Sequence, residues 1–222
     1  EILRVLHAAD LPCDIEKDSF VRVGAPTGTA AFNIKFQATT IHRLIHWFTP
    51  PYFKELGSTE ALHYLQKHLQ NTHLLILDEV SMIGRQMMGR IDSRFRQAKG
   101  GVADDDETLG GASCVAVGDP AQCEAIMDQQ LYDTVPHKNT GTDFDKQHVQ
   151  LSNRGLEVYS TFHKVIVLTK THRLTTIENP ETEEEQAFNE RAERFVQVLR
   201  RLRDLDWLSL IHISEPTRHR RI

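Results

Sequence analysis

The chain has 222 residues, a formal net charge of −5 and an apolar share of 40%, so it can fold as one substantial domain, with room for the start of a second. That composition excludes a disordered chain and a polycation that coats nucleic acid indiscriminately. Three scattered cysteines exclude a disulfide framework and a four-cysteine zinc site, and no apolar run approaches the ~20 residues of a membrane helix. The cysteine usage favours a reducing, intracellular compartment. We further expect a monomer without a membrane or zinc partner, in the nucleus or a mitochondrion of a eukaryote, or otherwise in the cytoplasm.

The hydrophobic pattern alternates between strands and helices along the chain. In chain order, the expected elements are a helix at 1–9, a strand at 20–25, helices at 29–34, 40–47 and 58–70, a strand at 74–77, a helix at 83–98, strands at 114–117 and 164–168, and a helix at 183–205. The runs at 74–77 and 114–117 are apolar throughout, so we expect both to be buried strands. This alternation predicts an α/β fold, in which a parallel sheet carries helices on both faces.

The last helix has a clear start signal and a single apolar face. Thr182 followed three residues later by Glu185 is a capping box. The residues expected to share one face are Phe188, Ala192, Phe195, Leu199 and Leu202.

Polar residues follow three of the predicted strands, at the sheet edge where ligands bind in open parallel sheets. They are Asp78 and Glu79 after the first apolar run, Gln122 after the second, and Arg173 after the third. An aspartate there can hold a hydrated magnesium ion, and the next glutamate can orient and deprotonate water. The alternative is that the acids are solvated strand ends, Gln122 belongs to a turn and Arg173 is a surface charge.

Four segments in this order resemble motifs of the superfamily 1B helicases, the Pif-type and RecD-like enzymes, to which Helitron-type helicase domains are related. APTGTAA at 25–31 with TIHR at 40–43 resembles motif Ia, and LILDEVSM at 75–82 resembles the Walker B motif. VGDPAQ at 117–122 is similar to motif III and LTKTHR at 168–173 to motif IV. Residues 195–203 also resemble the helix that follows motif IV in these enzymes.

The resemblance implies a RecA-like P-loop NTPase domain that uses ATP and Mg2+. Asp78 would bind magnesium through water, and Glu79 would be the catalytic base. Gln122 would sense the γ-phosphate and couple it to DNA movement, and Arg173 would be an arginine finger. All four residues would therefore line the nucleotide site.

The same resemblance implies a single-stranded DNA partner. Thr27, Thr29, Thr40 and His42 would line the DNA track, where hydroxyls and backbone amides hold phosphates. Helix capping is the other explanation for the threonines, and for Thr27 and Thr40 the two are equally weighted.

The sequence departs from the family in three places. No glycine precedes a lysine, so the phosphate-binding loop G-x-x-x-x-G-K-[ST] is missing, and we expect it to lie upstream of Glu1. Residues 123–126 read CEAI where the family has Leu-Pro-Pro-Val after the motif III glutamine. Residues 35–38 read KFQA where a glycine is common, which weakens the DNA assignment.

We therefore expect residues 1–175 to be the first motor domain without its Walker A loop, and residues 176–207 to lead toward a second motor domain. Residues 208–222 look like adapter-derived, non-native sequence. The expected parent is an ATP-dependent 5′-to-3′ DNA helicase of genome maintenance, including repair, recombination and telomere maintenance, and the 222-residue fragment is expected to be inactive. The alternatives are a non-catalytic DNA-binding or assembly module with a degenerate nucleotide site, and a P-loop ATPase without a DNA partner.

Overall fold

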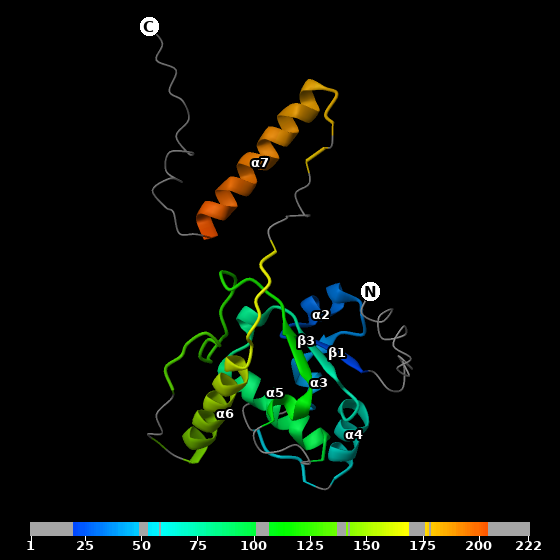
Figure 1. Cartoon of the computed structure of the whole chain (residues 1–222), viewed down its shortest axis with the longest axis vertical. Coiled ribbons are helices and arrows are strands. Elements are labelled where there is room, and N and C mark those ends of the chain that lie inside the picture. Colours follow the sequence, from blue (N-terminus) through cyan, green and yellow to red (C-terminus); the bar gives the residue numbers. More distant parts are fainter. Residues whose placement is uncertain are drawn as a thin grey trace. The chain divides into compact units, whose positions relative to one another are not determined.

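The computed structural model describes residues 20–48, 53–57, 59–100, 107–136, 141, 143–168, 176–177 and 179–203. The chain divides into two compact units, Glu1–Lys164 and Val165–Ile222, which are described separately. The elements are β1 (Val21–Ala25), α2 (Gly28–Ile34), β2 (Thr39–Thr40), α3 (Ile41–Leu44), α4 (Glu60–Leu69), β3 (Leu74–Leu77), η1 (Val80–Met82), α5 (Arg85–Ala98), η2 (Thr108–Gly111), β4 (Ser113–Ala116), α6 (Asp143–Ser160) and α7 (Glu183–Arg203) (Figure 1).

The first unit is built on a parallel sheet of four strands in the order β2-β1-β3-β4. β3 lies between β1 and β4, with Leu77 in register with Gly24 on one side and Ala116 on the other. The short strand β2 pairs with the end of β1 through Ala25 and Thr40. Because all strands are parallel, their carboxyl ends meet at one edge, as the predicted α/β fold requires.

The main core lies against one face of this sheet. Leu75 and Leu77 of β3 are fully buried there. Helices α3, α4, α5 and α6 all contribute to the same cluster, which includes Ile41, Ile45, Leu65, Leu69, Met88, Ile91, Phe95 and Val158. Burial of such side chains contributes roughly 1.5–3 kcal/mol each, so this layer holds the sheet edge in place.

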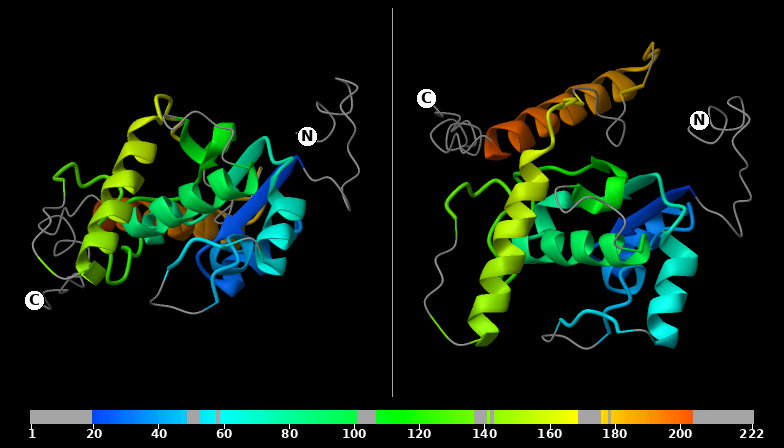
Figure 2. Two further views of the ribbon diagram at one scale, coloured as in Figure 1. Left: turned by 90° about the horizontal axis from the view of Figure 1, so that it is seen from below. Right: turned by 60° about the horizontal axis from the view of Figure 1, so that its bottom comes forward.

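Helix α6 crosses the amino-terminal half of α5 at very close range (Figure 2). A Cβ atom added to Gly89 would collide with the backbone carbonyl of Leu151, and one added to Gly155 would collide with the carbonyl of Arg85. The two glycines therefore allow the helix backbones to touch. The sequence did not predict α6, because Gly155 weakens a helix locally and its value appears only in this contact.

Buried charged side chains, Arg85 and Asp92, bind the helices of the same layer to one another. The Arg85 side chain is fully buried and donates to the carbonyl oxygens of Ser152 at 3.2 Å and Val135 at 2.7 Å. Arg154 Nε donates to the buried carboxylate of Asp92 at 2.7 Å. A buried charge costs less free energy when it is bonded in this way.

Several predicted elements are confirmed, with small changes at their ends. The strands at 74–77 and near 20–25 and 114–117 form, as do the helices near 29–34 and 83–98. The helix expected at 58–70 is α4, and Thr59 occupies its N-cap position. The helix expected at 40–47 is only the short α3, because the chain turns at Ile45 and His46 adopts a left-handed backbone with φ of 52°. The helix expected at 1–9 lies outside the described residues.

Two predictions about strands are wrong. Residues 164–168 form no strand, and the side chains of 165–168 are between 76% and 87% exposed. Apolar composition alone does not make a strand, because a strand also needs a neighbour to receive its backbone hydrogen bonds. β4 forms but is not fully buried, since Val115 is 48% exposed.

The second unit contains α7, and its predicted capping box is confirmed. Glu185 N donates to Thr182 Oγ1 at 3.2 Å, and Thr182 N donates to Glu185 Oε2 at 3.1 Å. The large apolar side chains of the predicted face are between 43% and 52% exposed. No described helix is long and apolar enough to cross a membrane.

Candidate functional site

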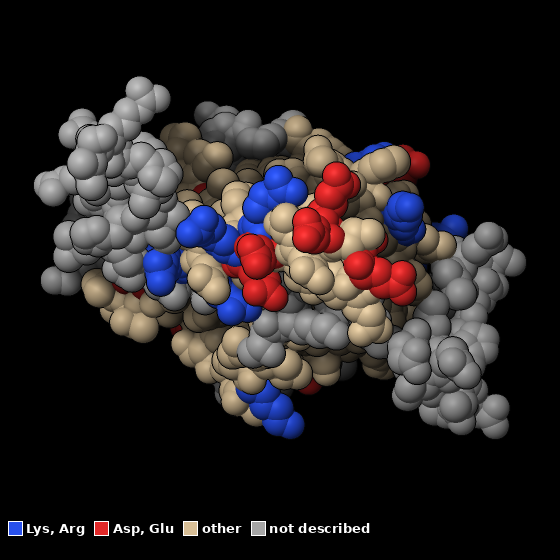
Figure 3. Space-filling view, turned by 90° about the horizontal axis from the view of Figure 1, so that it is seen from above, with Lys and Arg blue, Asp and Glu red and all other residues tan. Residues whose placement is uncertain are grey.

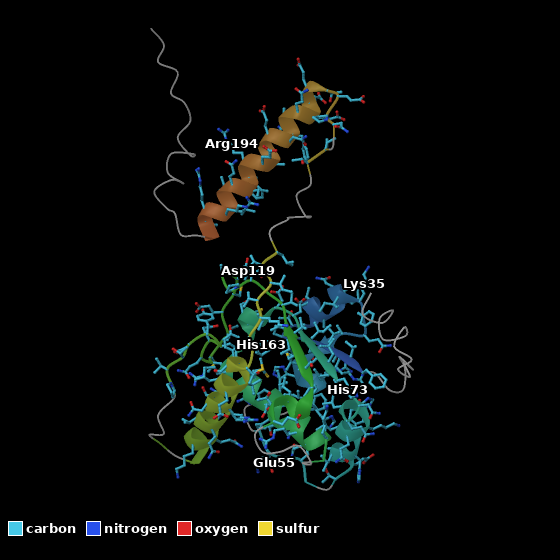
Figure 4. All side chains as sticks on the ribbon, in the orientation of Figure 1. Lys35, Glu55, His73, Asp119, His163 and Arg194 are labelled. Atoms are coloured by element: carbon cyan, nitrogen blue, oxygen red, sulfur yellow. The ribbon has the colours of Figure 1, made fainter. Side chains whose placement is uncertain are left out.

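The chain segments that follow β3 and β4 are joined directly at the carboxyl edge of the sheet. Val117 N donates to Leu77 O at 2.7 Å, and Val80 N donates to Val117 O at 3.0 Å. These bonds bring the Asp78–Glu79 pair beside the start of the predicted motif III. Figure 4 shows Asp119 toward the end of the unit that also carries Lys35, with His73 and Glu55 toward the opposite end.

Glu79, the predicted base, has an unusual backbone. Its φ of 50° and ψ of 49° place it in the left-handed region, where side chains other than glycine are uncommon. This conformation costs roughly 1–2 kcal/mol, so the surrounding structure must hold it in place. Met82 N donates to Glu79 O at 3.0 Å and begins η1, which turns the chain away from the sheet immediately after the carboxylate. Six other described non-glycine residues also have a positive φ, so the functional interpretation of Glu79 rests on its position after β3, beside Asp78, and not on its backbone alone.

Gly118 is a site-forming residue that the sequence analysis did not single out. A Cβ at this position would lie 2.8 Å from Val80 N and 3.1 Å from the Val80 side chain. A larger residue would push the segment after β4 away from the Asp78–Glu79 pair. The only signal in the sequence was the small residue after an apolar strand, which is also common in ordinary turns.

The turn that carries Gln122 forms without the usual Leu-Pro-Pro sequence. Asp119 Oδ1 accepts a hydrogen bond from Ala121 N at 3.0 Å, and Asp119 O accepts one from Gln122 N at 3.0 Å. The turn is therefore closed by the aspartate before Gln122, and not by prolines after it. The Gln122 side chain is exposed at this edge.

Thr27 and Thr40, for which helix capping and DNA contact were equally weighted, differ in the structure. Thr27 Oγ1 accepts a hydrogen bond from Ala30 N at 3.2 Å and caps α2. Thr40 makes no side-chain cap bond at α3, although it occupies the N-cap position. Thr29 is exposed in the first turn of α2. Register with Ala25 brings Thr40 to the edge where Thr27 follows β1.

His42 lies on α3 with its ring stacked on the indole of Trp47, at 5.0 Å between centroids and 10° between planes. Burial lowers the pKa of His42, and the nearby charge of Arg90 lowers it further. The neutral imidazole is therefore favoured, and it offers one donor and one acceptor. Acidic and basic side chains are interspersed on the face shown in Figure 3. Because the net charge of the chain is −5, a DNA contact would have to come from a local group of side chains rather than from the whole surface.

Comparison with known proteins identifies the family of the domain. The AAA domain family matches residues 7–153, about two thirds of the chain. The chain belongs to the AAA domain family. A search of curated protein sequences gave no match.

Among solved structures, the Pif1 helicase from Candida albicans is 18% identical to the AAA domain with a TM-score of 0.50, over 82% of this chain and 33% of that one. The likeness shows a shared fold, which is RecA-like. The Pif1 helicase from Bacteroides in complex with ADP-AlF3 and ssDNA is 30% identical, with a TM-score of 0.37, over 49% of this chain and 24% of that one. The Bacteroides Pif1 bound to ssDNA is 28% identical with a TM-score of 0.38, over 56% of this chain and 26% of that one. The AAA domain thus spans between 24% and 33% of the length of these helicases.

The residues at the sheet edge fit a magnesium ion better than they fit a triphosphate. Magnesium is commonly held by one or two carboxylates, substrate phosphates and water, and the half-buried Asp78 supplies such a carboxylate. The described residues contain no cluster of three or more metal-binding side chains. No Gly-Lys pair in the sequence supplies a phosphate loop. Arg173, the predicted arginine finger, lies outside the described residues.

Proposed function

We propose that this AAA domain is the first motor domain of a Pif-type DNA helicase, which couples ATP hydrolysis to 5′-to-3′ movement on single-stranded DNA in genome maintenance. The observation that carries the proposal is the position of Glu79, held beside Asp78 and against the Gly118 segment at the carboxyl edge of the sheet. The order of the four helicase-like motifs along the chain supports it.

The proposed roles follow from the positions of the side chains. Asp78 would hold the hydrated magnesium ion, and Glu79 would orient the attacking water and accept its proton. Bound ATP would supply the phosphoryl group, and bound magnesium would neutralise part of its charge. Gln122, exposed on its turn, would contact the γ-phosphate, and Arg173 would stabilise charge on the transferred group.

The DNA track would run past the carboxyl end of β1. Thr29 and Thr40 offer hydroxyls there that are not used as helix caps in the structure. Thr27 uses its oxygen as a cap acceptor, but its hydroxyl hydrogen can still be donated to a phosphate. His42 offers a flat imidazole on which a base can stack.

The 222-residue chain alone should not hydrolyse ATP, because it has no phosphate loop. Purified chain should therefore show no ATPase rate above background, with or without single-stranded DNA. A clear DNA-stimulated rate would overturn this part of the proposal.

The decisive experiment uses a longer protein that contains this domain together with a phosphate loop. Glu79→Gln should lower the DNA-stimulated ATPase rate by about a hundredfold or more, because the base is lost while the shape is kept. Glu60→Gln, an exposed glutamate at the start of α4, is the matched control and should leave the rate unchanged. ATP turnover that does not respond to DNA would indicate a P-loop ATPase without a DNA partner. DNA binding without any turnover would indicate a non-catalytic module.

A further inference from the structure

Trp47 connects a predicted DNA-contact residue to a buried cation. The ring is buried, and the His42 imidazole stacks on it almost in parallel. Trp47 N also donates to His42 O at 2.8 Å, which ties the two backbones together. The guanidinium carbon of Arg90 lies 4.4 Å from the centroid of the Trp47 ring. This distance is well within cation–π range.

The position of Arg90 is energetically unfavourable for a charged side chain. Its residue is only 6% exposed, and its Nε has no hydrogen-bond partner. Nη2 donates to Gln86 Oε1 at 3.0 Å, one turn earlier on α5. Burial lowers the pKa of Arg90, and the carboxylate of Asp128 opposes that effect. Folding alone would favour an apolar residue at such a position, since a buried and incompletely bonded charge destabilises a protein.

Asp128 fixes the start of α5, on which Arg90 sits. Its two carboxylate oxygens accept hydrogen bonds from Gln86 N and Met87 N, each at 3.1 Å. Arg85 N also donates to the carbonyl of Gln129 at 2.9 Å. Asp128 belongs to the loop that follows Gln122, so that loop is fastened to the first turn of α5. A negative side chain at this position is favoured by the helix dipole.

We propose that Arg90 is a positioning residue, which supports the Trp47 ring, fixes the His42 imidazole at the DNA-facing edge and connects it to the loop that follows Gln122. The contacts form an unbroken series from Asp128 through Gln86, Arg90 and Trp47 to His42. The DNA part of this inference rests on the proposed function. The contact between Arg90 and the stacked rings does not, and it can be tested without DNA.

The chemistry of arginine explains why this residue type suits the position. Its planar guanidinium stacks on an indole face and keeps its charge when buried, whereas lysine offers only a point charge on a flexible stem. The same charge favours the neutral form of His42, which would contact DNA by stacking and hydrogen bonding. Movement of the loop at Asp128 would shift the first turn of α5. Arg90 would move with it, and the Trp47 ring on which His42 stacks would lose part of its contact.

The first test measures the His42 ring by NMR in the full 222-residue chain. Arg90→Met removes the charge and keeps the length of the side chain, so the His42 ring resonances should move and the pKa should rise toward its ordinary 6.5. Arg90→Lys keeps a positive charge and should shift the pKa less. Arg194→Met removes the same charge from an exposed position on α7. It should change neither the His42 ring resonances nor the pKa of His42.

The second test measures binding of a fluorescent oligothymidylate by anisotropy. Arg90→Met should weaken binding by about threefold to tenfold, the range expected for loss of one cation–π support. His42→Ala should weaken it similarly, and the double variant should be no weaker than His42→Ala alone, because the two residues act through one contact. If the unaltered chain does not bind the oligonucleotide, the DNA part of the proposed function fails. The NMR test then still decides whether Arg90 positions His42.

The proposal is overturned if a folded Arg90→Met chain keeps the His42 resonances and pKa of the original chain. If Arg90→Met does not fold, Gln86→Leu replaces it, since that change removes the acceptor that orients the guanidinium and leaves the charge. It should move the His42 resonances in the same direction. Asp128→Asn tests the connection to the loop, and unchanged His42 resonances in that variant would remove the loop from the proposal.

Discussion

The carboxyl edge of the sheet and the α5–α6 layer use polar residues in opposite ways. In the layer, Arg85 is fully buried and its donors are bonded to backbone carbonyls and an amide oxygen. At the edge, Glu79 sits in a strained backbone and Gln122 is exposed. The layer therefore stabilises the domain, while the edge leaves chemical groups available at some cost in stability.

This contrast shows that charge alone does not identify a functional residue. Each hydrogen bond to a buried charged group is worth about 1.5–3 kcal/mol, and a residue such as Arg85 is fully occupied by its own fold. Residues that are free to bind a ligand belong to loops with fewer contacts and lower local stability. The three experiments below test whether the two regions differ as the structure indicates.

The largest expected difference is in cysteine reactivity. Burial raises the pKa of Cys114 on β4 to about 12, which lowers its thiolate fraction by about a thousandfold from that of an ordinary thiol. Cys123 is exposed directly after Gln122. Iodoacetamide at about pH 8 should therefore modify Cys123 at least about a hundredfold faster, as followed by peptide mass spectrometry. Similar rates would show that β4 opens as readily as the edge loop.

A smaller effect is expected from the closest contact in the α5–α6 layer. Gly155→Ala would place a methyl group against the Arg85 carbonyl, so the free energy of unfolding should fall by about 1–3 kcal/mol. Urea denaturation measures this change. Gly57→Ala is the matched control, because no atom lies within 4 Å of the added Cβ, and it should change stability by no more than about 0.5 kcal/mol. Equal effects would contradict the tight packing of the layer.

The smallest effect concerns α7, whose start is held by local bonds. Backbone N–H groups of Glu181 and Thr182 donate to Glu185 and lower its pKa below the ordinary 4.5. The ionised Glu185 therefore stabilises the start of α7 above the ordinary pKa of 4.5, and this stabilisation is lost as pH falls through the lowered pKa of the folded state. NMR shifts of the first turn should report this fraying on acidification. Glu185→Gln should remove the pH dependence, whereas an unchanged profile in Glu185→Gln, or its loss in the control Glu184→Gln, would assign it to another group.

The sequence predicted those features that depend on neighbours along the chain. The strand at 74–77 follows from four consecutive apolar residues, of which Leu75 and Leu77 are fully buried, and the capping box follows from the Thr182 and Glu185 spacing. The placement of Asp78 and Glu79 at a strand end follows from the same run. These features need only local backbone geometry and hydrophobic burial, so a single segment contains the information.

Other features required the tertiary fold. The sequence weighted capping and DNA contact equally for Thr27 and Thr40, and only the backbone around each showed that Thr27 caps and Thr40 does not. Residues 164–168 have a strand-like composition but no partner in the described part of the chain. Helix α6 was missed because Gly155 is unfavourable until it meets α5.

The sequence by itself determined which chemical groups the domain contains and which strand ends they follow. Only the tertiary structure decided which of these groups have neighbours that hold them in place. His42 and Trp47 lie in one segment, at and just after α3, whereas Arg90 lies on α5, so the contact of Arg90 with the stacked rings depends on how these two segments pack together. Packing of this kind joins residues that are distant along the chain, and no periodicity within one segment can encode it.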